Sequence, residues 1–455
     1  MTQPKRNTHR LLLALGLSLS CSLTVNLPAW AAPEKPDLKL GFIKLTDMAP
    51  LAVALERGYF EDEGLYVQLE AQANWKVLLD RVIDGQLDGA HMLAGQALGA
   101  SIGIGTQAAM QTAFVMDLNG NACTVSNAVW QHIASTVARN SDGKPQYPIS
   151  ADKLQPALTA KTSQGKKLQF GMVFPVSSHN YELRYWLAAG GIHPGYYAPQ
   201  TGDNSGQLKA DVLLSVTPPP QMPATMEAGT IDGYCVGEPW NQQAVLRDLG
   251  LPLVTNYDIH TNLAEKIFGV SQNWAERYPQ THFHLIKALI RAGHWLDANN
   301  NANRAAAAKL ISQPYYVGAD EKVIANSMSG VFAYARDDVR PTPDFNVFFR
   351  YHATYPYYSD AIWYLSQMRR WGQISETKPD SWYQDIARQV FQPALYQQAA
   401  KALIAEGKLS AADFPDFATE SGYRPIDATH FIDGKKFDAT APNAYLQQFA
   451  IGLKD

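Results

Sequence analysis

The hydrophobic pattern near the start of the folded region predicts a strand, a helix and a second strand in close succession. LKLGFI at residues 38–43 is an apolar run typical of a buried strand, and the helix APLAVALERGYF follows at 49–60. Pro50 suits the first turn of that helix and Gly58 suits its end. GLYVQLEA at 64–71 alternates as a half-buried strand does. This unit places a helix N-terminus at the carboxyl edge of a parallel sheet, where open α/β sheets bind ligands.

One pattern occurs twice along the chain: a helix, a glycine, and then Leu or Ile followed by Asp-Gly at the start of a strand. In the first copy the helix VLLDRVID ends at Gly85 and Leu-Asp-Gly follows at 87–89. In the second copy the helix ends at Gly229 and Ile-Asp-Gly follows at 231–233. We interpret the two copies as two α/β lobes built on one plan. The alternative is a chance recurrence of a common helix-to-strand turn.

The chain is predicted to cross between the lobes twice. The turn residues DLNGN at 117–121 end a strand, and we place the first crossover there. We place the second crossover in IDGYCVGEPW at 231–240. The first lobe then comprises residues 38–117 and 235–455, and the second lobe comprises residues 118–234. The last 130 residues of the first lobe are predicted to be mainly amphipathic helices, such as IWYLSQMRRWGQ.

The N-terminus is typical of a secretory signal peptide. Three basic residues precede the apolar run LLLALGLSL, and Ala-Trp-Ala at 29–31 provides a small-residue cleavage site. We therefore expect residues 1–31 to be removed by cleavage after Ala31 and the mature chain to be periplasmic. Attachment as a lipoprotein through Cys21 is the alternative.

Composition and charge exclude several classes of protein. The chain has 455 residues, 46% of them hydrophobic and 18% charged, as expected for a globular protein of two or three domains. Removing the three basic residues of the signal changes the formal charge from −4 to −7, which disfavours nucleic acid or an anionic membrane as partner. Only Cys123 and Cys235 remain in the mature chain, too few for a cysteine metal site. They could pair in an oxidising compartment or stay as buried free thiols.

Two common sequence signatures of catalysis are absent. The chain lacks the H-E-x-x-H zinc motif and the Walker phosphate-binding loop. Two chemically capable residues lie at predicted strand ends: Trp75 follows the second strand, and His179 follows the strand LQFGMVF. Packing or surface positions are the alternatives to a cleft for both. An exported two-lobed chain of this kind is predicted to be a solute-binding protein and not an enzyme, with its ligand between the lobes.

Several stretches resemble the nitrate and bicarbonate periplasmic-binding family of ABC transporters. The most characteristic is TPPPQMPATMEAGTIDGYCVGEPWN at 217–241, and SSHNYELRYWLAAGGI at 177–192 is similar to another family stretch. EKIFG, DGAHML and LNGN resemble shorter family motifs. The resemblance implies an α/β, two-lobed type II periplasmic-binding-protein fold with two strand crossovers and a helical C-terminal region. It also implies a monomer without a cofactor that closes over a small anion and passes it to an ABC transporter permease in the inner membrane.

The same resemblance implies a set of ligand-binding residues. Carried over position by position, these are Trp75, Gly120, Asn121, His179 and Lys266. The family's Asn-Gly-Gln is Asn-Gly-Asn here, so the amide at Asn121 has a shorter side chain, and an insertion at 197–210 also departs from the family pattern.

The chemistry of these residues favours the nitrate branch of the family. Nitrate offers only acceptor oxygens, and Trp75, Asn121, His179 and Lys266 can all donate hydrogen bonds. The function predicted is capture of nitrate, with nitrite as a second ligand, for an ABC importer. The alternatives are a bicarbonate or sulfonate receptor of the same fold and a secreted enzyme of the pyrimidine-precursor type. In the bicarbonate branch an acidic residue replaces the lysine and a calcium ion assists binding. The presence of Lys266 in this sequence therefore argues against the bicarbonate branch.

Overall fold

The computed structural model describes residues 31–197, 207 and 209–453. The described residues from Ala32 onward form one compact unit. The predicted signal peptide, apart from Ala31, and most of the insertion at 197–210 lie outside the described residues. No helix among the described residues is both long enough and apolar enough to span a bilayer.

The first of two main sheets has six strands in the order β13-β4-β10-β3-β1-β2. Its strands are β1 (Asp37–Phe42), β2 (Tyr66–Ala71), β3 (Gly89–Leu93), β4 (Met110–Asn119), β10 (Ala264–Ser271) and β13 (Asn346–Val347). β1, β2 and β3 are parallel, and β10 runs antiparallel between β3 and β4. The predicted opening unit of strand, helix and strand is therefore present.

The second sheet has five strands in the order β7-β6-β8-β5-β9. Its strands are β5 (Asn121–Ser126), β6 (Leu168–Met172), β7 (Val212–Val216), β8 (Gly233–Gly237) and β9 (Gly250–Thr255). β6 is parallel to β7 and β8, while β5 is antiparallel to β8 and β9. In each sheet three parallel strands are thus followed by an antiparallel strand, so the two sheets share one plan.

The repeated Asp-Gly pattern has the same structural role in both sheets. Asp88 accepts a hydrogen bond from the backbone N–H of Lys39 on β1 at 2.9 Å. Asp232 accepts from the backbone N–H of Gln169 on β6, also at 2.9 Å. Each aspartate thereby satisfies a strand N–H beside the third parallel strand. The recurrence thus marks a shared structural device in the two α/β halves.

The chain crosses between the sheets at two points. β4 ends at Asn119 in the first sheet and β5 begins at Asn121 in the second. The prediction of a return within 231–240 needs correction, because both β8 and β9 pair with β5 in the second sheet. The return therefore lies between Thr255 and Ala264, where β10 joins β3 and β4.

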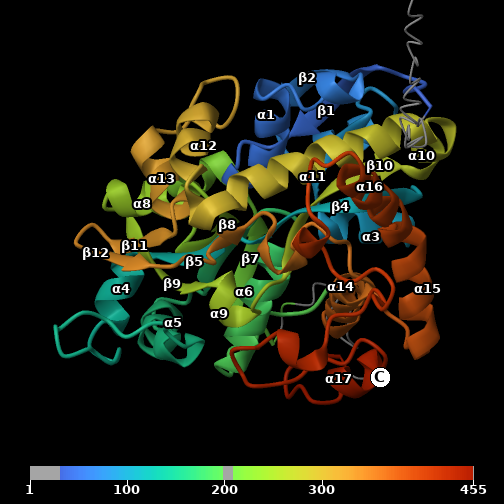
Figure 1. Ribbon diagram of the computed structural model, residues 1–455. Helices are drawn as coiled ribbons and strands as arrows, with labels where there is room; N and C mark the ends of the chain where they lie inside the picture. Colours follow the sequence, from blue (N-terminus) through green and yellow to red (C-terminus); the bar gives the residue numbers. More distant parts are fainter. Residues whose placement is uncertain (1–30, 198–206, 208, 454–455) are drawn as a thin grey trace, which may run out of the picture. The chain divides into compact units, whose positions relative to one another are not determined.

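Helices cover both sheets, as Figure 1 shows. Those that contact the second sheet are α4 (Asn127–Ile133), α5 (Gln155–Thr162), α6 (Ser178–Ala189), α7 (Met222–Glu227), α8 (Trp240–Leu246) and α9 (Asn256–Ile259). Those that contact the first sheet are α1 (Ala49–Glu56), α2 (Trp75–Ile83), α3 (Ala94–Ser101), α10 (Gln272–Arg277), α11 (Pro279–Asn301), α15 (Asp380–Val390) and α16 (Pro393–Ala405). The remaining helices are α12 (Arg304–Ile311), α13 (Glu321–Met328), α14 (Tyr358–Arg370) and α17 (Pro442–Leu446).

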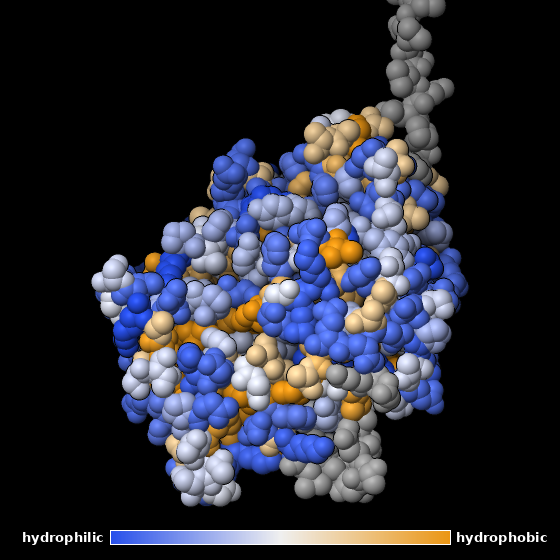
Figure 2. Space-filling view, turned by 90° about the horizontal axis from the view of Figure 1, so that it is seen from below, coloured by the Kyte–Doolittle hydropathy of each residue, from blue (hydrophilic) through white to orange (hydrophobic). Residues whose placement is uncertain are grey.

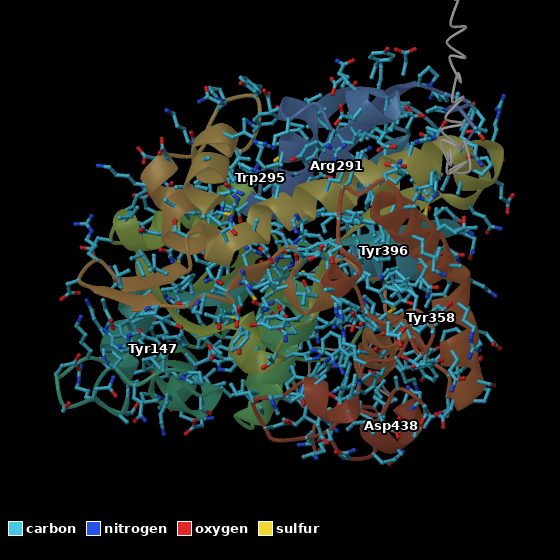
Figure 3. The ribbon with its side chains drawn as sticks, in the orientation of Figure 1. Tyr147, Arg291, Trp295, Tyr358, Tyr396 and Asp438 are labelled. Carbon is cyan, nitrogen blue, oxygen red and sulfur yellow. The ribbon has the colours of Figure 1, made fainter. Side chains whose placement is uncertain are left out.

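Helix α11 packs against α1 on one face of the first sheet. Arg291 and Trp295, labelled in Figure 3, lie one turn apart on α11. The Arg291 guanidinium lies 4.1 Å from the centre of the Tyr59 ring, and the Arg57 guanidinium lies 4.7 Å from the Trp295 ring. These cation–π contacts flank the apolar cluster that α11 shares with β1 and α1.

The C-terminal region differs from its prediction in two respects. It contains strands as well as helices: β11 (Val331–Ala335) pairs with β12 (Asp338–Pro341), and β13 joins the first sheet. Helix α14, predicted to be amphipathic, is buried from Ser359 to Arg370. It is buried on all sides because α3, α6, α15 and α17 all contact it.

The two sheets share one continuous apolar core. A single cluster includes Leu98 on α3 of the first sheet, and Phe170 and Tyr181 beside the second. On the face drawn in Figure 2, short apolar stretches are surrounded by polar residues. The two sheets are therefore packed against each other through this cluster.

We expect Gly95→Ala to test how closely the two halves approach. A Cβ at Gly95 on α3 would lie 2.1 Å from the backbone oxygen of Val176, which precedes α6. Forced overpacking of this kind costs about 1–3 kcal/mol in free energy of unfolding. Denaturant unfolding should show that loss.

Gly99→Ala is the matched control on the same helix. A Cβ at Gly99 would meet the Val176 side chain at 3.3 Å and no backbone atom within 3.4 Å. Alanine is favoured over glycine in a helix by about 1 kcal/mol, so this variant should match or exceed the parent in stability. Equal stability of the two variants would contradict the close packing at Gly95.

Candidate functional site

Two of the predicted binding residues lie where parallel strands give way to helices. Trp75 is the first residue of α2, and the side chain of Asn74 caps that helix by accepting from the Val77 N–H. His179 is the second residue of α6, and Ser177 caps that helix by accepting from the Asn180 N–H. Both helices follow the carboxyl ends of parallel strands, so the predicted sheet edge does carry these side chains.

Lys266 is the centre of a buried polar cluster at this edge. Its ammonium has no exposed surface, and Nζ lies 2.8 Å from Oδ2 of Asp47. The Nζ also contacts Oε2 of the adjacent Glu265. A buried ammonium needs such partners, because leaving it unpaired would carry a large desolvation cost. Two of its three protons are therefore directed at carboxylates.

A β-bulge brings Glu265 and Lys266 together. Consecutive residues of a regular strand point to opposite faces, which would separate these two side chains. In the pairing of β10 with β4, however, Ala264 faces Leu118 while Lys266 faces Asp117. Glu265 is the extra residue on β10, and the bulge turns its side chain toward the same cluster.

Asp47 links Lys266 to His91. Asp47 lies in the short 3₁₀ helix at Thr46–Met48, between β1 and α1. Its Oδ1 is 2.7 Å from Nε2 of His91 on β3. Although burial opposes it, the charge of Lys266 together with His91 holds the pKa of Asp47 below its usual value. Burial lowers the pKa of His91, so that imidazole is neutral near pH 7.

A second set of contacts ties the first sheet to α6. The Ser178 hydroxyl donates to Oε1 of Glu265 and accepts from the Asn121 amide at 3.3 Å. The same Asn121 amide donates to Oε2 of Glu182 at 3.2 Å. Burial raises the pKa of Glu182 to about 7. The amide donors of Asn121 are thus engaged within the protein, whereas the sequence predicted that they face a ligand.

Gly120 lies at the crossover in the left-handed region, with a φ of 93°. A Cβ there would lie 2.5 Å from Nδ2 of Asn346 and 3.1 Å from Oδ2 of Asp117. Asn346 donates to that Asp117 oxygen at 2.8 Å. Glycine is therefore required by both conformation and space, and the crossover passes directly beside the cluster.

Three buried carboxylates in the cluster are spaced closely enough to consider a cation. Oxygens of Asp47, Asp117 and Glu265 lie within 4.8 Å of one another. The Lys266 ammonium already contacts two of them. Burial and the Asp47 charge raise the pKa of Asp117 well above its usual value, which disfavours the charged form that a metal ligand needs. The donor set thus suits the lysine ammonium better than a metal ion.

Three predicted binding residues carry buried polar atoms with no hydrogen-bond partner among the described residues. These atoms are Nε1 of Trp75, Oδ1 of Asn121 and Nε2 of His179. The Lys266 Nζ lies 5.5 Å from the Trp75 ring, and Nδ1 of His179 lies 3.5 Å from Glu265. Burial and the Lys266 charge lower the pKa of His179 well below its usual value. Leaving such groups unpaired is costly, so their grouping indicates a ligand site.

The structure thus brings the predicted residues together from both sheets. Trp75 and Lys266 come from the first sheet, while Asn121 and His179 come from the second. Sequence reasoning missed the contacts of Lys266, which are Asp47, Asp117 and Glu265, and it missed His91, which contacts Asp47. Asp47, like Trp75 and His179, follows the carboxyl end of a strand, and that position could have indicated Asp47 as a site residue. The place of Glu265 in the cluster could not be foreseen in this way, because it depends on the bulge in β10.

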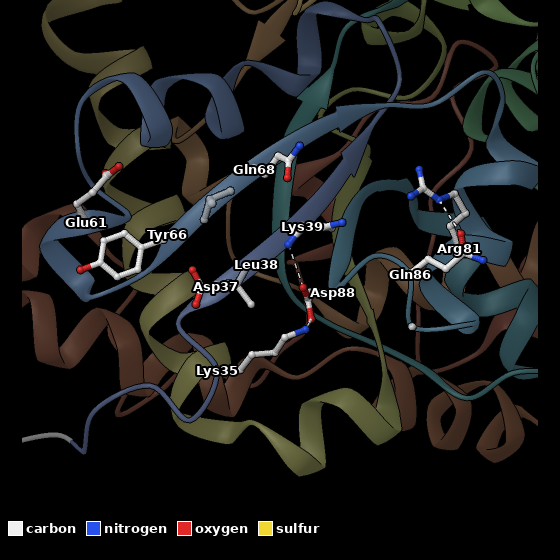
Figure 4. A pocket seen from close by; sticks show the side chains of 12 residues that line it. Lys35, Asp37, Leu38, Lys39, Glu61, Tyr66, Gln68, Arg81, Gln86 and Asp88 are labelled. Atoms are coloured by element: carbon white, nitrogen blue, oxygen red, sulfur yellow. Dashed lines mark hydrogen bonds and ion pairs between the residues drawn. The ribbon is translucent and has the colours of Figure 1, made fainter.

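A surface pocket of about 800 Å³ lies elsewhere (Figure 4). It is lined by the first residues of β1 and β2, which are at the opposite edge of the sheet from the cluster. Its buried carboxylate, Asp88, is paired with Lys35 and with the Lys39 N–H. This pocket is therefore separate from the predicted site.

Comparison with known proteins places the chain in a family. The family model described as the NMT1-like family matches residues 31–312. The chain belongs to the NMT1-like family. It is 31% identical over 443 residues to the nitrate/nitrite binding protein NrtA of Nostoc sp. (strain PCC 7120), covering 95% of this chain and 90% of that protein.

A second relative is longer than this chain. The nitrate import ATP-binding protein NrtC of Synechocystis sp. (strain PCC 6803) is 35% identical over 422 residues. The match covers 92% of this chain but 56% of NrtC, so the chain spans about half of that relative's length.

The family's fold is also found in a solved structure. The crystal structure of the periplasmic nitrate-binding protein NrtA from Synechocystis PCC 6803 has a TM-score of 0.78 and 26% identity, covering 93% of this chain and all of that one. The predicted two-lobed type II binding-protein fold is therefore confirmed. Family membership and fold support a solute-binding role, and the absence of enzymatic activity stays a prediction.

We expect Glu238→Gln to change how stability depends on pH. Glu238 follows β8 with a buried carboxyl group that accepts from the Gln242 N–H at 3.1 Å. Burial raises its pKa from 4.5 to about 8. The folded chain therefore binds more protons than the unfolded chain between these values. Raising the pH through this interval should lower the free energy of unfolding, by at most about 1.4 kcal/mol per pH unit for this one group.

In Glu238→Gln the part of the pH-dependent fall in the free energy of unfolding that comes from Glu238 should disappear, because glutamine has the shape of the protonated acid and does not titrate. Denaturant unfolding at several pH values between 5 and 8 measures the slope. Glu227→Gln, at an exposed position on α7, is the control and should keep the parent slope. A Glu238→Gln slope equal to that of the parent would contradict the protonated state of Glu238.

Proposed function

We propose that this chain is an exported, periplasmic binding protein that captures nitrate, with nitrite as a second ligand, and delivers it to an ABC importer. The observation that carries the proposal is the meeting of Lys266 with two buried nitrogens, Nε1 of Trp75 and Nε2 of His179, that have no hydrogen-bond partner in the described part of the chain. These groups come from both sheets. A small ligand held among them would touch both halves of the protein.

The donors fit the chemistry of nitrate. Nitrate carries one negative charge and three acceptor oxygens, and it has no proton to donate. The Trp75 indole is a donor only, and one Lys266 proton is left after its two carboxylate contacts. Nε2 of His179 donates when it carries the imidazole proton. The pairing of Lys266 with Asp47 also fixes the direction of its remaining proton.

Gly120 and Asn121 complete the proposed site from the crossover. Gly120 allows the backbone to pass close to Asp117. Asn121 donates to Glu182 and Ser178, while its Oδ1 has no partner among the residues that the structure describes. We assign them the role of shaping the site beside the stronger donors. No cofactor is required for binding in this scheme.

The named relatives support the direction of the proposal. The names of NrtA and NrtC connect those proteins to nitrate or nitrite binding and to nitrate import. By extension, the partners proposed here are a membrane permease and its ATPase, and the binding protein itself acts as a monomer. We expect residues 1–31 to be removed on export, so the mature chain should begin at Ala32.

Bicarbonate is a second candidate, because the carboxylates beside Lys266 could accept its O–H. Asp47, Asp117 and Glu265 form that acceptor group. Calorimetry with nitrate, nitrite, chloride, and bicarbonate with and without calcium decides between the ligands. Tight binding of bicarbonate alone would overturn the nitrate assignment, and turnover of any of these ligands would indicate an enzyme.

We expect Lys266→Ala to weaken nitrate binding by roughly 10 to 150-fold, the equivalent of losing a charged hydrogen bond worth ~1.5–3 kcal/mol. The variant also leaves two carboxylates unpaired, so it should be less stable. Calorimetric titration with nitrate measures the affinity, and circular dichroism checks the fold.

Lys287→Ala is the matched control for the loss of a buried ammonium. Lys287 is 3% exposed and lies 2.7 Å from Glu63 and 2.6 Å from Glu406, away from the cluster. It should lose stability and keep the parent affinity for nitrate. A Lys266→Ala affinity within about twofold of the parent, a difference below 0.5 kcal/mol, would remove Lys266 from the site.

We expect Trp75→Phe to separate binding from stability. The indole Nε1 has no partner in the described protein, so its removal breaks no internal hydrogen bond. If the indole donates to the anion, affinity should fall roughly tenfold or more, for a loss of ~1.5–3 kcal/mol. Thermal unfolding without nitrate should show only the loss of packing that the smaller ring causes.

Trp186→Phe should give the opposite result. Its Nε1 donates to the Ile149 carbonyl at 3.0 Å, a bond inside the protein. That variant should lose stability, by about 1–3 kcal/mol for an unsatisfied buried carbonyl, and retain nitrate affinity. An unchanged affinity in Trp75→Phe would place the indole outside the ligand site.

A further inference from the structure

Cys123 and Cys235 lie directly opposite each other on neighbouring strands. In the antiparallel pairing of β5 with β8, the Cα of Cys123 is the partner of the Cα of Cys235. Both side chains are buried in the same apolar cluster, and both are free thiols in the structure. The sequence left their pairing open, and the strand register now places them together.

The hydrogen-bond pattern identifies the type of pair they form. Ser126 donates to the Asp232 carbonyl at 2.9 Å, and Glu238 donates to the Gly120 carbonyl at 3.2 Å. Hydrogen-bonded and non-hydrogen-bonded pairs alternate along an antiparallel ladder. The pairs Ser126–Asp232 and Gly120–Glu238 are hydrogen-bonded, and Cys123–Cys235 lies three pairs from each of them. Cys123 and Cys235 are therefore a non-hydrogen-bonded pair.

That position is the one at which opposite side chains approach most closely. Cα atoms of a non-hydrogen-bonded pair are about 4.5 Å apart, with both side chains on the same face of the sheet. Disulfides span Cα separations of roughly 4.4–6.8 Å. The backbone of this pair therefore already has the spacing that a disulfide requires.

We propose that Cys123 and Cys235 form a disulfide in the exported protein, which ties β5 to β8 beside the candidate ligand site. The proposal goes beyond anion binding and rests on the proposed export only for the source of its oxidant. That oxidant is a protein or small-molecule disulfide of the oxidising compartment.

The chemistry is a two-step thiol–disulfide exchange. One cysteine thiolate attacks the oxidant disulfide, forming a mixed disulfide and releasing one oxidant thiolate. The second cysteine thiolate then attacks the mixed bond, which forms the Cys123–Cys235 bond and releases the other oxidant thiolate. The two cysteines lose two electrons and two protons, and the oxidant becomes two thiols.

The bond should form before the strands are buried. Both thiols are almost completely inaccessible in the folded chain, so a bulky oxidant cannot reach them. Burial and the neighbouring Cys123 also raise the pKa of the Cys235 thiol, which leaves little of the reactive thiolate. The folded dithiol should therefore resist oxidation, and the oxidised form should resist reduction.

The bond would act close to the candidate site. Asn121 and Gly237 are the next non-hydrogen-bonded pair along the same two strands. A Cβ at Gly237 would lie 3.3 Å from Oδ1 of Asn121 and 3.5 Å from Oδ2 of Asp47. A disulfide two residues away would fix the spacing of the strands at this point. It would also close a long loop between positions 123 and 235, which favours stabilisation.

The test uses the mature chain from Ala32, refolded from the denatured and reduced state in a buffer of reduced and oxidised glutathione. The product is unfolded in an alkylating agent and its mass is measured. We expect no alkylation, a mass lower than the dithiol form by two hydrogen atoms, and a linked peptide pair containing Cys123 and Cys235. The oxidised protein should also unfold at a higher denaturant concentration than the protein refolded under reducing conditions.

Three variants serve as controls. Cys123→Ser and Cys235→Ser should each show one alkylated thiol and the lower unfolding midpoint of the reduced parent. The double variant Ala122→Cys with Cys123→Ala moves one thiol to the opposite face of β5, so it should refold with two free thiols. A disulfide in that variant would overturn the register argument, and two alkylated thiols in the parent would overturn the proposal.

The outcome is independent of the proposed ligand. The thiol count needs no nitrate, so a disulfide in a protein that fails to bind nitrate would leave this inference standing and remove the nitrate assignment. Nitrate binding by a parent protein that keeps two free thiols would support the nitrate assignment and overturn the proposed disulfide.

Discussion

The buried ammonium of Lys266 is the constraint on which the candidate site depends. An ammonium without exposed surface must be compensated where it lies, and Asp47 and Glu265 provide that compensation. Asp47 comes from the turn between β1 and α1 and in turn lies against His91 on β3. One charge thus fixes the relative positions of three segments at the carboxyl edge of the first sheet. Any change in that edge alters the direction of the lysine protons.

The same cluster joins the two sheets. Glu265 accepts from Ser178 at the start of α6, and Asn121 donates to Glu182 one turn later on that helix. These contacts lie at the junction of a single apolar core that runs through both halves of the molecule. A ligand bound at the cluster would therefore lie where the two sheets contact each other. Binding and the packing of the halves should be coupled in a protein of this construction.

Local sequence signals predicted much of the fold, because helix caps and glycines act over a few residues. Asn74 and Ser177 cap α2 and α6, and both Gly85 and Gly229 adopt the left-handed conformation that ends a helix. The repeated Asp-Gly pattern correctly indicated two halves of one plan. Strand pairing is not local, which is why the second crossover was placed too early: nothing within β9 reveals that it pairs with β5.

The sequence by itself determined the fold class, the family resemblance and the five residues now proposed to bind a ligand. It could do so because strand ends, caps and motif residues are encoded locally. Tertiary structure decided which groups surround Lys266, because the bulge at Glu265 overrides the alternation that a strand sequence implies. It also decided that α14 is buried on every side, since its neighbours come from distant segments. The opposition of Cys123 and Cys235 depends in the same way on register, which only the paired strands define.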